Sequence, residues 1–200
     1  MSENHKLEYI EPHGTEEVKA ILNPIVKEWF FGKFKDFSLT QRYGVKNIND
    51  RKNILVSAPT GGTKTLTAFL GILNYVVGLA LKNELEDKMY AVYVSPLKAL
   101  SGDIEVNLKI PLAEIKELAE KKGLKMQEIR VALRTGDTDV KERVKQAKKI
   151  AHIYVTTPES LAIVLTTIKF VESLRALEFI IVDEIHALTN KRGVYLSLTL

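Results

Sequence analysis

The sequence predicts an α/β domain in which a mostly parallel sheet is covered by helices on both faces. Short apolar segments of strand length alternate along the chain with longer segments of helical spacing. These strand segments are mostly apolar, as strands covered on both faces are, whereas strands with one solvated face alternate apolar and polar residues. The 200 residues are enough for one such domain with a sizeable core.

The composition is that of a globular protein, with 46% apolar and 27% charged residues. The net charge of +4 is compatible with a nucleic-acid partner, although extra Lys on a solvated surface explains it equally well. The absence of Cys excludes disulfides and thiolate metal sites, and the four His lack the spacing of metal ligands. We find no apolar run of membrane-spanning length and no signal peptide, so we expect a cytoplasmic protein with no membrane partner.

The first 50 residues precede the alternating part of the chain. Residues 1–17 are polar and predict a flexible tail. Residues 18–50 predict flanking helices: helical spacing runs over Glu16–Phe31 with an interruption at Pro24, and Thr40–Asn49 predicts a short helix.

Residues 51–200 contain the alternation and show no repeat or linker, so they are interpreted as one domain. The predicted strands are Asn53–Ser57, Tyr90–Ser95, Glu128–Arg134, Ile153–Thr156 and Phe179–Val182. The predicted helices between them are Lys64–Lys82, an irregular stretch Ala99–Lys122 interrupted by Pro111, Asp139–Lys149 and Pro158–Ile168.

Two segments leave a choice between ordinary packing and contact with nucleic acid. Aromatic residues gather between Trp29 and Phe37, where helical spacing favours packing on the flank of the domain over stacking on bases. The Lys-rich segment Lys141–Lys149 is interpreted as the solvated face of a helix, with a phosphate contact as the alternative.

The stretch Asn53–Thr65 has the layout of a phosphate-binding loop: an apolar strand, a turn of small residues, then Lys-Thr at the start of a long helix. Loop amides and the helix N-terminus point N–H groups at an anion, and the helix dipole adds positive partial charge. Lys64 would supply a full charge to the outer phosphates of ATP, and the Thr65 hydroxyl would help to hold Mg²⁺. The predicted nucleotide-binding residues here are Ala58, Pro59, Thr60, Gly61, Gly62, Thr63, Lys64 and Thr65.

This loop departs from the general pattern at two positions. Ala58 and Thr63 stand where the pattern has its first and last Gly. The Gly before the Lys normally lets the backbone approach the phosphates, so Thr63 predicts a weakened site. An ordinary strand-to-helix turn, with Gly for its bends, is the alternative interpretation.

The last predicted strand, Phe179–Val182, ends in the acids Asp183 and Glu184. Burying such acids without a cation is costly. Beside a phosphate loop, Asp183 would bind Mg²⁺ and Glu184 would accept a proton from the water that attacks the γ-phosphate. The alternative is that Asp183 caps a short helix through Leu188.

Polar loops follow the other strands as well, and ligands of open parallel sheets gather at the carboxyl ends of strands. Each loop alone is a weak signal; Thr-Pro-Glu-Ser, for instance, is also a good helix N-terminus. Their placement at successive strand ends favours a common binding edge. The loops are Ser95–Leu100, Arg134–Thr138, Thr157–Ser160 and Asp183–His186.

Taken together, these motifs resemble superfamily 2 DExH-box helicases, and most closely the Lhr (large helicase-related) family. Asp183–His186 is the DExH box, and Ala58–Thr65 resembles motif I. The resemblance covers the chain from about residue 22 onward. It is carried further by Trp29-Phe30, Gln41-Arg42, Tyr93–Leu100 with Asp103-Ile104, Arg134–Thr138 with Glu142-Arg143, Thr156–Ile163, Val182–Leu188 and Lys191–Gly193.

The resemblance implies the first RecA-like domain of an ATP-driven translocase that moves 3′ to 5′ on single-stranded DNA and opens DNA–RNA or DNA–DNA duplexes. It implies that Gln41 reads adenine, that Lys64, Asp183 and Glu184 are catalytic, that Thr65 and Asp183 hold Mg²⁺, and that His186 couples hydrolysis to the strand. The residues implied to grip single-stranded DNA or RNA are Pro96, Leu97, Lys98, Arg134, Thr135, Gly136, Thr157, Pro158, Glu159 and Ser160. The expected partners are therefore single-stranded, duplex or hybrid nucleic acid and a second RecA-like domain.

The family's fold also implies that the sequence ends after motif II, before the strand that leads to motif III and before the second RecA-like domain. In that fold the missing strand lies between Asn53–Ser57 and Phe179–Val182, so we expect a gap there and weak folding. Two other functions compete with the helicase motor. One is a nucleic-acid-binding module with a degenerate ATPase, motivated by Thr63. The other is a different P-loop ATPase, disfavoured by His186 and the strand-end loops.

Overall fold

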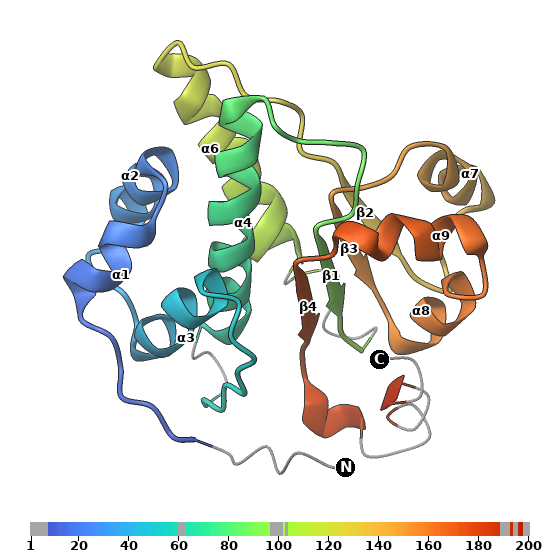
Figure 1. Ribbon diagram of the computed structural model, residues 1–200, viewed down its shortest axis with the longest axis horizontal. Helices are drawn as coiled ribbons and strands as arrows, with labels where there is room; N and C mark the ends of the chain where they lie inside the picture. The colour runs from blue at the N-terminus through green and yellow to red at the C-terminus, as the bar shows by residue number, and fades with distance from the viewer. Residues whose placement is uncertain are drawn as a thin grey trace.

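The computed structural model describes residues 8–59, 63–96, 102, 104–188, 193, 196 and 197. Its centre is a parallel four-stranded sheet in the order β2-β3-β1-β4 (Figure 1). The strands are β1 (Ala91–Val94), β2 (Val131–Arg134), β3 (Ile153–Thr156) and β4 (Phe179–Val182). The predicted fold class is thus confirmed, and four of the five predicted strands are found.

Helices cover both faces of this sheet (Figure 1). One face carries α1 (Thr15–Ile21), α2 (Pro24–Lys33), α3 (Leu39–Asn49), α4 (Lys64–Lys82) and α6 (Ile110–Lys121). The other carries α7 (Val140–Lys148), α8 (Pro158–Val164) and α9 (Ile168–Ser173). Side chains alternate along the strands, so that Tyr93 of β1 lies in the core beneath α4 while Val92 and Val94 lie in the opposite core. The short helical turns are η1 (Glu105–Lys109), η2 (Leu174–Ala176) and η3 (Ile185–Leu188).

Proline explains where several helix boundaries differ from prediction. Pro24 begins α2, with the Asn23 side chain accepting from the Ile25 amide as an N-cap. Pro111 is the second residue of α6, and it follows the wider π turn η1. Because proline cannot donate to the carbonyl four residues back, the wide turn relieves a mismatch there. Helix α1 begins at Thr15, inside the segment predicted as tail.

The predicted strand Asn53–Ser57 is wrong: these residues are described and form no strand. Strand β4 is an edge of the sheet, and the side chains of Leu55 and Ile180 are 74% and 53% exposed. A strand needs a neighbour for its backbone groups, and none of the described segments supplies one here. The expectation that Asn53–Ser57 and β4 are not paired directly is confirmed.

The aromatic segment packs into the domain and the Lys-rich segment is solvated, as the sequence predicts. Trp29, Phe30 and Phe37 are buried, and the Phe30 and Phe37 rings stack with centroids 4.8 Å apart. Every residue of α7 is partly or fully exposed.

Helices α3 and α4 approach each other closely at two glycines. A Cβ at Gly71 would lie 2.5 Å from Cγ2 of Ile48, and a Cβ at Gly44 would clash with the Thr67 methyl group. The two helices therefore pack with backbone against side chain, which only glycine allows.

Helix α4 corrects one expectation about membranes. Within the described residues it is long and apolar enough to cross a bilayer, with a mean hydropathy of 1.5, and 61% of its apolar window is buried inside the protein. Apolar length alone therefore does not separate this core helix from a membrane span.

Candidate active site

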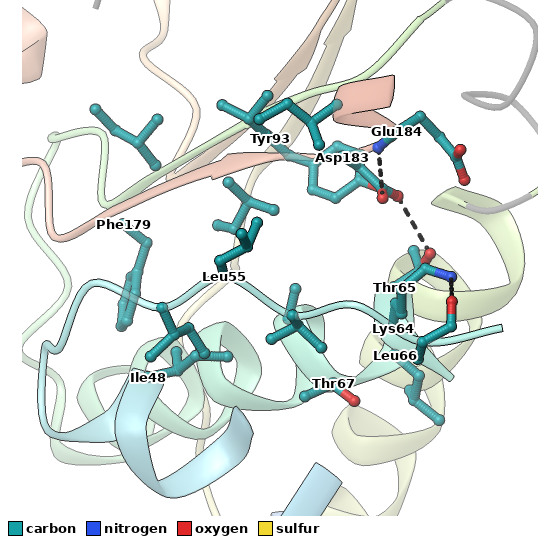
Figure 2. A pocket seen from close by; sticks show the side chains of 18 of the residues that line it. Ile48, Leu55, Lys64, Thr65, Leu66, Thr67, Tyr93, Phe179, Asp183 and Glu184 are labelled. Atoms are coloured by element: carbon teal, nitrogen blue, oxygen red, sulfur yellow. Dashed lines mark hydrogen bonds between the residues drawn. The ribbon is translucent and has the colours of Figure 1, made fainter. Parts of the chain in front are cut away.

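The N-terminus of α4 carries Lys64 and Thr65 at the carboxyl edge of the sheet (Figure 2). The Lys64 ammonium donates to the carbonyls of Ala58 and Pro59, at 2.7 and 3.2 Å. A long cationic side chain thus folds back over its own loop. The predicted ligands Thr60, Gly61 and Gly62 lie outside the described residues.

Asp183 follows β4 directly, and its backbone amide donates to the Val94 carbonyl of β1 at 2.8 Å. The Thr65 hydroxyl donates to Asp183 Oδ2 at 3.3 Å, and the Tyr93 hydroxyl donates to the same oxygen. The Glu184 amide donates to Oδ1 at 2.8 Å. The sequence-predicted metal residues, Thr65 and Asp183, are therefore in contact although 118 positions separate them.

Glu184 and His186 lie at the mouth of this site. Glu184 has a left-handed backbone with φ of +51°, an uncommon conformation for a residue with a side chain. Its Oε2 lies 3.1 Å from Nε2 of His186, which is 79% exposed on its side chain. The short helix predicted as the alternative does form, as η3, and Asp183 accepts an amide just before it. This bond joins neighbouring residues and is not an N-cap bond, which would come from an amide two or three residues further on.

Gln41 is connected to the phosphate loop through side chains of α3. It is 2% exposed, and it forms a capping box with Ser38 at the start of that helix. The Ser38 and Thr63 hydroxyls lie 2.6 Å apart. Thr63 has φ of +58°, a left-handed conformation that is uncommon for a β-branched residue.

A cavity of about 1220 Å³ opens beside these residues. It runs from the Lys64, Asp183 and Glu184 side chains along β4 to Leu55 (Figure 2). No three His, Asp or Glu side chains among the described residues gather to bind a metal by themselves. The donor set that is present, one hydroxyl and one carboxylate, suits Mg²⁺, which takes few protein oxygens and completes its shell with phosphate and water.

The strands that precede the other polar loops end at the same edge of the sheet. Val94, Thr156 and Arg134 are in register across β1, β3 and β2, so the described residues that directly follow them begin side by side. The Thr157 hydroxyl caps α8 and donates to Ser160 Oγ at 3.1 Å, and both side chains are buried. Helix capping therefore occupies these two hydroxyls, whereas Gly136 and Glu159 are exposed. The predicted nucleic-acid residues Leu97 and Lys98 lie outside the described residues.

Sequence reasoning missed two contributors to the site, Tyr93 and Ser38. Tyr93 occurs in an apolar strand and looked like core, and Ser38 precedes the predicted helix by two residues. Two sequence signals could have indicated them. Tyr93 lies in the strand before a polar loop, and Ser38 with Gln41 forms the spacing of a capping box.

Comparison with known proteins agrees with this geometry. Residues 38–199 match the DEAD/DEAH box helicases. The chain is 51% identical over 196 residues to the ATP-dependent helicase Lhr-Core of Methanocaldococcus jannaschii, covering 98% of this chain and 23% of that protein. It is 37% identical over 189 residues to the Lhr helicase/uracil glycosylase of Escherichia coli, covering 90% of this chain and 12% of that protein. The structure of Mycobacterium smegmatis helicase Lhr bound to ssDNA and AMP-PNP matches with a TM-score of 0.80 and 36% identity, over 91% of this chain and 23% of that chain.

A strand-end acid beside a Lys-Thr helix N-terminus, on a parallel sheet, defines the RecA-like ATP-binding domain of a P-loop motor protein. The chain belongs to the DEAD/DEAH box helicases, and within them it is the first RecA-like domain of the Lhr type. It spans less than a quarter of the length of these relatives. The predicted family is confirmed.

Proposed function

We propose that this domain binds ATP with Mg²⁺ and is the ATP-hydrolysing half of a helicase that moves along single-stranded nucleic acid. The observation that carries the proposal is the contact of Thr65 with Asp183 beside Lys64, at the N-terminus of α4. A helix N-terminus with a cation and a hard-oxygen pair is chemistry suited to a nucleoside triphosphate.

Each residue of the site has a distinct role in this proposal. Lys64 would leave the carbonyls of its own loop and bind the outer phosphates, while Thr65 and Asp183 would hold the metal. The metal, when bound, neutralises charge that develops on the phosphates. Glu184 accepts the proton of the attacking water, and its contact with His186 connects that acid to the exposed mouth of the site. We propose that Gln41 of α3 contacts the adenine.

The nucleic-acid partner is inferred from the strand-end loops and from the relatives. The Lhr structure with 36% identity holds ssDNA and AMP-PNP, and strands β1, β2 and β3 end in register at one edge here. We propose that this edge contacts the backbone of single-stranded DNA or RNA, and that the whole protein opens duplexes or DNA–RNA hybrids with a second RecA-like domain. A cytoplasmic location and a role in DNA repair are further proposals, compatible with a DNA translocase.

Calorimetry with Mg-ATP tests the core of this proposal. Binding should be lost in Lys64→Ala and kept in Lys116→Ala, which removes an exposed lysine of α6 remote from the site. Equal binding by both variants would exclude a phosphate site at α4. If the wild-type protein binds single strands but no nucleotide, the domain is instead a nucleic-acid-binding module with a degenerate ATPase.

A further inference from the structure

Tyr93 is a buried residue of β1 that joins the sheet to the helix of the nucleotide site. It is 1% exposed, and its ring stacks on Phe69 of α4 with centroids 4.7 Å apart and an angle of 27° between the rings. Ring packing alone would be satisfied equally well by Phe. The hydroxyl therefore needs a separate explanation.

That hydroxyl donates to Asp183 Oδ2, the oxygen that also accepts from Thr65. A carboxylate at the end of a strand has two rotatable side-chain bonds, and besides Tyr93 it is held here by the Glu184 amide and the Thr65 hydroxyl. Here the Asp183 amide is fixed to β1 through the Val94 carbonyl, and Tyr93 on the same strand fixes its carboxylate. Figure 2 shows the Tyr93 ring beside Asp183, on the far side from Lys64.

We propose that Tyr93 is a positioning residue for the magnesium site: its hydroxyl holds the Asp183 carboxylate in the orientation in which it meets the metal with Thr65. The inference rests on the proposed nucleotide function. A hydrogen bond from a neutral hydroxyl to a carboxylate is strong, because the acceptor is charged. Groups that orient metal ligands in this way typically change metal affinity by about 10- to 100-fold when they are removed.

The test is a Mg²⁺ titration of nucleotide binding in the intact protein, with ATP binding in EDTA as the metal-free reference. Tyr93→Phe keeps the ring on Phe69 and removes only the hydroxyl. We expect the Mg²⁺ concentration at half-saturation to rise by about 10- to 100-fold, with metal-free ATP binding unchanged. Tyr154→Phe, the same change at a buried tyrosine of β3 in the opposite core, is the matched control and should shift neither quantity.

A double-variant cycle with Asp183→Asn separates positioning from general stability. If Tyr93 acts through this carboxylate, Tyr93→Phe should no longer change the Mg²⁺ dependence in the Asp183→Asn background. An unchanged Mg²⁺ dependence in Tyr93→Phe, an equal shift in Tyr154→Phe, or an equal loss of metal-free binding would each overturn the inference. A wild-type protein that binds no Mg-ATP would overturn the proposed function, and this inference with it.

Discussion

Replacing Thr63 by Gly changes the backbone strain at the start of the nucleotide-binding helix. Thr63 has φ of +58° and ψ of +18°, a conformation that costs a β-branched residue about 1–3 kcal/mol. Its hydroxyl contact with Ser38 at 2.6 Å returns about 0.5–1.5 kcal/mol of that. Glycine adopts the same conformation without strain, but it makes no such contact and loses about 0.4–1 kcal/mol through the greater freedom of the unfolded chain.

The relief of strain, the lost hydroxyl contact and the greater freedom of the unfolded chain nearly cancel in the free energy of unfolding. Thr63→Gly should change the free energy of unfolding by no more than about 2 kcal/mol in either direction. The glycine backbone can move closer to a phosphate, and no Cβ crowds it. Because Thr63 has this strain without a ligand, only the crowding of the phosphate by its side chain acts on binding. Mg-ATP should therefore bind more tightly in Thr63→Gly, by about tenfold for each 1.4 kcal/mol of crowding that is removed.

Calorimetry on the wild type, Thr63→Gly and Thr63→Val decides the matter. Valine keeps the branched side chain and the strain but removes the hydroxyl, so it should not tighten binding. Unchanged affinity in Thr63→Gly, or the same tightening in Thr63→Val, would refute the reasoning.

Two further predictions concern nucleic acid and pH. Single strands should bind weakly and with little sequence preference, with an affinity that falls steeply with salt, by a logarithmic slope of about 0.7 per neutralised phosphate; binding insensitive to salt would contradict this. Burial, with Arg130 nearby, lowers the pKa of His152 from 6.5 to about 4, so the folded state should lose up to roughly 3 kcal/mol as pH falls from 6.5 to 4. That part of the loss should be absent in His152→Gln, as chemical denaturation at several pH values would show.

The sequence predicted those elements whose signal is local. Helix α4 and strands β3 and β4 have the predicted bounds, because apolar periodicity and small-residue turns define them within a few positions. Asn53–Ser57 shows the limit of such reasoning. Its apolar residues favour a strand, but a strand also depends on a neighbour, and sequence composition does not reveal whether that neighbour is present.

In the site, too, residues with a local sequence signal were predicted, and residues that depend on distant contacts were not. The residues of the Lys-Thr and Asp-Glu motifs were recognised because each motif is contiguous. Tyr93 was not recognised, because its role depends on the parallel pairing of β1 with β4, which places it beside an acid 90 positions later. Hydrogen bonds over such separations follow from topology, and topology is specified by the whole chain.

The two glycines between α3 and α4 have a consequence for the size of ligand that the site accepts. Gly44 and Gly71 hold the helices at a separation that a methyl group would increase. Gln41 belongs to one helix and Lys64 to the other, so the distance between the proposed base contact and the proposed phosphate contact is fixed before any ligand arrives. A fixed distance between the two contacts favours ligands of matching length, because a ligand that lacks its base or its phosphates cannot reach both of them. Gly71→Ala would move the two helices apart and so increase this distance, while Gln41 and Lys64 themselves stay unchanged.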